Sequence, residues 1–111
     1  MAKNTPEVLH KVTQREFNPL ETLQILKANQ IWLWSWAARN FSQWNNKALW
    51  FTVSGHLHKG IVLITLAWND TYTVTLLTTK WTVKKEITDV YFDELAQTID
   101  INVERIPQYN S

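Results

Sequence analysis

The stretch IVLITLAWNDTYTVTLLT, at positions 61–78, decides the fold of this chain of 111 residues. Its first part, residues 61–68, is apolar at both alternating sets of positions, as in a central strand that is buried on both faces. Asn69 and Asp70 follow, and both tolerate the positive φ angle that a two-residue hairpin turn requires. Residues 71–78 then alternate threonine with larger apolar side chains. The stretch therefore predicts an antiparallel hairpin inside a sheet.

Three further stretches show the alternation that is typical of a β-strand. They are Gln30 to Ala38, Ala48 to Ser54, and Trp81 to Ile87. The last of these is the most polar, so we predict that it lies at an edge of the sheet. Residues 39–47 are expected to form a polar connection, and residues 55–60, which glycines bracket, a turn.

A helix is predicted on each side of these strands. Asn18 can cap a first helix that has Pro19 at its first position and runs to about Ala28. A second helix should begin at Asp89 and reach about Glu104, because apolar residues recur there at helical spacing. The expected class is α+β: an antiparallel sheet of four to five strands in meander order, with an N-terminal and a C-terminal helix packed on one face.

The composition is that of one small globular domain. Hydrophobic residues make up 45% of the chain, and the absence of cysteine excludes disulfides and thiolate metal sites. We predict a flexible arm or short edge strand over residues 1–16, a single domain over residues 17–106 and a tail over residues 107–111. The sequence has no recognisable signal peptide and no apolar stretch long enough to cross a bilayer, so we expect a cytoplasmic protein without membrane contact.

Trp32, Trp34 and Trp36 lie two residues apart, so on a strand their indoles would share one face. Three interpretations of such a face are open. It is a core layer, since tryptophan is highly buried on average, or an aromatic homodimer interface, or a surface on which nucleic-acid bases stack.

Charge is distributed unevenly along the chain. Between Lys27 and Lys85 lie seven basic residues and one acid, whereas between Asp89 and Glu104 lie five acids and no base. A basic and aromatic sheet could hold phosphates with its cations while its indoles stack bases. The predicted interaction surface consists of Trp32, Trp34, Trp36, Trp50, Arg39, Asn40, Phe41, Lys47, Lys80 and Lys84.

His56 and His58 form an H-x-H pair in the turn between the two glycines. Two imidazoles could ligate one metal ion, but structural and catalytic zinc sites need three or four protein ligands. A polar turn is the other interpretation of the pair. The sequence contains no hydrolase, zinc-protease or phosphate-loop motif, so neither an enzyme nor a cofactor is predicted.

Three motifs, taken together, resemble a family of small proteins of unknown function that bacterial conjugative elements and phage carry. WAARNF at 36–41 resembles the TGAKNF of that family, and DVYFDEL at 89–95 resembles its DVYADQL helix start. Residues 60–66 and 70–74 resemble its ITL…DLYDVEF hairpin. The resemblance implies an accessory protein of a mobile element and carries over no activity.

The resemblance also singles out Arg39, Asn40 and Phe41 within the first motif. Trp34 and Trp36 depart from it, because small or aliphatic residues are expected at those positions. The tryptophan face would therefore belong to a branch of the family.

The leading functional hypothesis is a non-enzymatic binding or interaction protein of a bacterial mobile element that associates with itself through an aromatic sheet face. The first alternative is binding of single-stranded nucleic acid through the basic, tryptophan-rich sheet. The second is a metal-dependent enzyme at the turn of His56 and His58. No small-molecule substrate is predicted.

Overall fold

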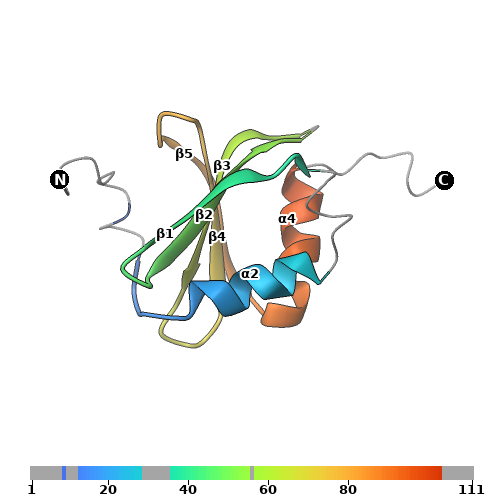
Figure 1. Cartoon of the computed structure of the whole chain (residues 1–111). Helices are drawn as coiled ribbons and strands as arrows, with labels where there is room; N and C mark the ends of the chain where they lie inside the picture. Colours follow the sequence, from blue (N-terminus) through green and yellow to red (C-terminus); the bar gives the residue numbers. More distant parts are fainter. Residues whose placement is uncertain (1–8, 10–12, 29–35, 56, 104–111) are drawn as a thin grey trace.

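A computed structural model describes residue 9 and residues 13–28, 36–55 and 57–103 of the chain (Figure 1). Its centre is a five-stranded antiparallel sheet in which neighbours in sequence are neighbours in space, in the order β1-β2-β3-β4-β5. The strands are β1 (Arg39–Trp44), β2 (Ala48–Ser54), β3 (Lys59–Leu66), β4 (Tyr72–Leu77) and β5 (Val83–Val90). The predicted α+β class with an antiparallel meander is confirmed. β3 is the central strand, as its apolar sequence predicted, and β5 forms an edge.

The turn between β3 and β4 is longer than predicted. The amide of Ala67 donates to the carbonyl of Thr71 (2.8 Å), and the amide of Asp70 donates to the carbonyl of Ala67 (3.0 Å). Asp70 has a positive φ of 68°. This is the pattern of a three-residue hairpin loop, a type I turn closed by one left-handed residue, so the prediction of a two-residue turn is wrong.

Helix α2 (Pro19–Lys27) begins where the sequence predicts. The side chain of Asn18 accepts hydrogen bonds from the amides of Leu20 (2.9 Å) and Glu21 (3.4 Å), which satisfies two of the first free donors of the helix.

The C-terminal helix starts later than predicted. β5 continues to Val90, which is buried and pairs with Tyr72, so Asp89 lies in a strand and does not begin a helix. A short 3-10 turn, η2 (Phe92–Glu94), precedes helix α4 (Leu95–Val103). The sequence misled here because the apolar residues before Leu95 also satisfy helical spacing, although strand pairing determines their conformation.

Among the described residues, the first strand of the sheet lies later in the sequence than predicted. Trp36 lies in a helical turn, and β1 forms instead from the polar stretch that was expected to be a connection. Asn40 takes a positive φ of 60° within an irregularity between Arg39 and Ser42, which lets this polar segment pair with β2 at the edge of the sheet. Residues 29–35, and with them most of the predicted strand, lie outside the described residues.

The two faces of the sheet bury separate apolar clusters. One cluster, which we call the helix-side cluster, joins side chains of β2, β3 and β4, among them Phe51 and Val62, to Leu26 of α2 and Ile99 of α4. On the other face, Ala48, Ile61, Leu63 and Leu77 surround Leu9, which is fully buried. Because alternate residues of a strand point to opposite faces, the apolar sequence of β3 supplies both clusters. Leu9 shows that part of the predicted N-terminal arm contacts the sheet.

In the part of the chain that the structure describes, no helix combines the length and apolarity needed to cross a membrane.

Trp36 links the helix-side cluster to α4, and this contact can be tested by mutation. Its indole N–H donates to Oδ1 of the buried Asp100 (3.1 Å). Trp36→Phe keeps an aromatic ring but removes this donor from a buried carboxylate, so we expect the free energy of unfolding to fall by about 1–3 kcal/mol in urea titrations. Trp50→Phe is the control, because the indole of Trp50 forms no hydrogen bond with a described residue. Equal losses in both variants would contradict the role of the bond.

Candidate functional site

The predicted aromatic surface does not form from its described members. Trp36 is fully buried in the helix-side cluster and stacks on Phe51, with ring centroids 6.2 Å apart and an interplanar angle of 9°. Trp50 precedes Phe51 in β2 and therefore points to the opposite face, where it contacts Trp81 edge to face (5.2 Å, 81°). Trp32 and Trp34 lie outside the described residues. Trp36 and Trp50 thus belong to different faces of the sheet.

The motif Arg39-Asn40-Phe41 has structural contacts in β1. Phe41 packs on Phe51 with ring centroids 4.9 Å apart, and the side-chain Nδ2 of Asn40 donates to the hydroxyl of Thr52 (3.2 Å). The side chain of Arg39 is exposed. These contacts bind the edge strand to its neighbour.

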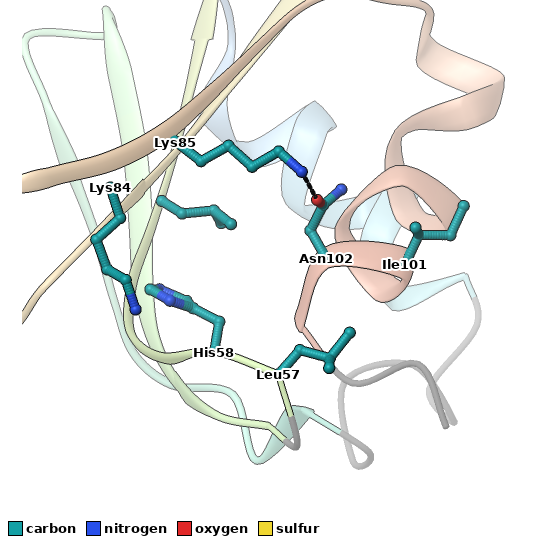
Figure 2. Close-up of a pocket in the computed structure, with 7 residues that line it drawn as sticks. Leu57, His58, Lys84, Lys85, Ile101 and Asn102 are labelled. Atoms are coloured by element: carbon teal, nitrogen blue, oxygen red, sulfur yellow. Dashed lines mark hydrogen bonds between the residues drawn. The ribbon is translucent and has the colours of Figure 1, made fainter. Parts of the chain in front are cut away.

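The predicted cations divide between the two ends of the sheet. Lys47 lies in the turn between β1 and β2, at one end of the strands. Lys80, in the turn between β4 and β5, and Lys84, at the start of β5, lie at the other end. At this second end a cavity of about 440 Å³ opens between the β2–β3 turn, the start of β5 and the end of α4 (Figure 2).

We call this cavity the basic pocket and define it by seven lining residues. Its polar side chains are His58, Lys84, Lys85 and Asn102, and its apolar walls are Leu57, Leu76 and Ile101.

A β-bulge brings the two adjacent lysines to the same pocket. β4 and β5 pair Leu76 with Lys85 but Leu77 with Val83, so Lys84 is an extra residue without a partner in the register. In a regular strand the side chains of Lys84 and Lys85 would point to opposite faces. The bulge re-aims one of them, and Figure 2 shows both side chains extending toward the cavity.

The β2–β3 turn is fixed to the end of α4. The amides of Leu57 and His58 both donate to the carbonyl of Val103 (2.6 and 3.2 Å). A Cβ atom on Gly55 would lie 2.4 Å from the same carbonyl oxygen, so only glycine permits this close approach. The turn thereby satisfies a free carbonyl of the helix and holds His58 at the pocket.

His58 is a buried group with a fixed orientation. Only 3% of the residue is exposed, and its Nε2 donates to the carbonyl of Ile61 (3.2 Å). Burial lowers the pKa of His58 below its ordinary 6.5, and the nearby charge of Lys84 lowers it further. Hydrogen bonds to the carbonyls of Ile61 and Leu77 oppose the shift without reversing it. The imidazole is therefore neutral at neutral pH, and the charge of the pocket comes from its lysines.

The two lysines have different surroundings. Nζ of Lys85 donates to Oδ1 of Asn102 (2.7 Å), and the side-chain Nδ2 of Asn102 donates to the carbonyl of Thr98 (2.8 Å), so this ammonium is oriented. Lys84 forms neither a hydrogen bond nor an ion pair with any residue in the described part of the chain. No carboxylate of a described residue lines the pocket. Two positive charges beside apolar walls can accept an anionic group that carries an apolar neighbour.

The sequence singled out Lys84 and His58 but not Lys85, Asn102 or the apolar walls. The adjacent pair of lysines was the available signal. Strand alternation assigned them to opposite faces, and only the register of β4 and β5 reveals the bulge.

A metal site was the other hypothesis for this turn. The described residues contain no group of three histidine, aspartate or glutamate side chains that could hold a metal ion. Nε2 of His58 already donates to a backbone carbonyl, and His56 lies outside the described residues.

Comparison with known proteins returned no match: no protein-family model, no curated protein and no solved structure is significantly similar to this chain.

The lowered pKa of His58 predicts a pH dependence of stability. The unfolded chain protonates His58 near pH 6.5, before the folded chain does, so the free energy of unfolding should fall as the pH decreases below about 6.5. Urea titrations at pH 7.5 and pH 5 measure this loss. His58→Gln can keep a donor for Ile61 but does not titrate. The free energy of unfolding of this variant should therefore fall less between pH 7.5 and pH 5. The same loss in both proteins would assign the effect to other groups.

Proposed function

We propose that this protein is a non-enzymatic binding protein whose basic pocket takes an anionic group with an apolar neighbour. One observation carries the proposal: the bulge in β5 directs Lys84 and Lys85 into a cavity that no described carboxylate lines. Lys84 has no anionic partner among the described residues. An ammonium group beside apolar walls interacts more strongly with an anion than one in open solvent.

The chemistry of the lining supports binding rather than catalysis. His58 is the described lining residue best suited to acid–base chemistry, and its Nε2 is engaged by the carbonyl of Ile61. Among the described residues, neither a nucleophile nor a carboxylate stands beside it in the lining. We assign His58 a positioning role at the base of the β2–β3 turn.

We keep the hypothesis of an interaction protein of a mobile element, which the sequence resemblance implies. We propose that it binds through the basic pocket and not through the tryptophans. The helix arrangement that we propose places α2 and α4 on one face of the sheet. Its support is the cluster in which Leu26 of α2 and Ile99 of α4 join Phe51. Since Trp36 is buried within that cluster, the basic pocket is a better candidate surface than the tryptophans.

Binding of single-stranded nucleic acid is the second candidate. A phosphate is an anion that suits the pocket, and Lys80 extends the positive charge along the same end of the sheet. Trp81, only partly buried, follows Lys80 and could stack a base.

Titration of the labelled full chain with phenyl phosphate, followed by backbone amide NMR shifts, tests the proposal. We expect the largest shifts at His58, Lys85 and Asn102. The double variant Lys84→Gln, Lys85→Gln should weaken binding about tenfold, since each partly exposed charge pair contributes up to about 1 kcal/mol. Lys47→Gln removes the same charge at the opposite end of the sheet and should leave the affinity unchanged.

Shifts scattered over the whole surface, or equal affinities in all three proteins, would overturn the proposal. A decathymidine oligonucleotide separates the two candidates. If it binds far more tightly than phenyl phosphate and its affinity falls steeply with salt, nucleic acid is the better assignment.

A further inference from the structure

We infer that the ligand of the basic pocket is part of a second copy of this chain, namely the segment Tyr91-Phe92-Asp93-Glu94, which we call the acidic–aromatic turn. The inference rests on the proposed function and names its partner. Copies of the chain would then associate head to tail, with the pocket of one receiving the turn of the next.

The acidic–aromatic turn has an ordered backbone and side chains without partners. The amide of Glu94 donates to the carbonyl of Tyr91 (2.9 Å), which closes the 3-10 turn. Tyr91 is 57% exposed and Phe92 65% exposed. None of the four side chains makes a hydrogen bond, ion pair or ring contact with another described residue. Adjacent exposed aromatic rings are typical of a surface that a partner covers.

The turn and the pocket are chemically complementary. Asp93 and Glu94 can face the ammonium groups of Lys84 and Lys85. The rings of the turn can cover Leu57 and Ile101, which are 52% and 39% exposed at the pocket. Neither Asp93 nor Glu94 has a cationic partner in the described part of its own chain.

One chain cannot form this contact with itself. β5 begins with the lysines and leads to the turn, and α4 runs back from the turn to Asn102 at the pocket (Figure 1). Lys84 and Tyr91 are seven positions apart along the strand, about 23 Å at a rise of about 3.3 Å per residue. Two different patches at opposite ends of one molecule give a heterologous contact, which forms rings or open chains of copies.

Pairing of β5 edges is a poorer route to association. β5 is irregular in its pairing with β4 at two places, and Asp89 within it has a positive φ of 59°. Bulges and lysines on an edge strand hinder the addition of another strand. The basic pocket and the acidic–aromatic turn, at the two ends of β5, are therefore the better candidates for contact between copies.

Charge reversal at each end provides a reciprocal test on the full chain. Analytical ultracentrifugation should show the wild-type protein associating as its concentration rises, and more weakly at high salt. In the variant Lys84→Glu with Lys85→Glu, both the pocket and the turn are acidic. In the variant Asp93→Lys with Glu94→Lys, both are basic. Each variant alone should remain monomeric, and an equimolar mixture should associate again. Lys47→Glu lies across the sheet from β5, in the β1–β2 turn, and Glu21→Lys lies in α2, so both variants should behave as wild type.

A wild-type protein that remains monomeric at every concentration would overturn the inference, as would double variants that associate like wild type or a mixture that does not. Circular dichroism establishes that each variant is folded. If the acidic reversal does not fold, Lys84→Gln with Lys85→Gln replaces it and should weaken association. A monomeric protein that still binds phenyl phosphate in the pocket refutes this inference alone, whereas loss of both refutes the proposed function as well.

Discussion

The approach of Gly55 to the last carbonyl of α4 is the constraint on which the basic pocket depends. At this point the β2–β3 turn meets the helix so closely that a Cβ atom would lie 2.4 Å from the carbonyl oxygen of Val103. The same oxygen accepts the amides of Leu57 and His58, so one contact orders the turn and satisfies the end of the helix. The cavity is enclosed by the elements that this contact joins, with β5 as its third side. A side chain at Gly55 would therefore separate two walls of the pocket as well as strain the fold.

The centre of the sheet could be predicted from sequence because its residues leave little choice. β3 is apolar on both faces, and such a strand is stable only between two others. The edges could not be predicted equally well. β1 is polar and contains Asn40 in a left-handed conformation, so pairing with β2 and not its own composition makes it a strand. Asp89 and Val90 fit helical spacing, but the partner strand decides their conformation.

The tryptophans show that one position along a strand decides which face of the sheet a side chain lies on. Trp50 and Phe51 are neighbours in β2, yet Phe51 lies in the helix-side cluster with Trp36 while Trp50 meets Trp81 on the other face. The alternation rule predicted that Trp50 and Phe51 would separate. It could not predict that Trp36 lies in a helical turn, where the indole N–H reaches Asp100. That bond depends on residues 64 positions apart, and no local pattern records it.

The alternation of side chains along a strand also explains why the pocket could not be predicted from the sequence. An exposed edge strand invites unwanted pairing, and lysines and bulges are common defences against it. In β5 the bulge that disrupts the edge also removes the alternation of Lys84 and Lys85, so a protective irregularity concentrates charge on one side. His58 does not add to this charge, because burial lowers its pKa. The positive potential of the pocket therefore follows from strand register.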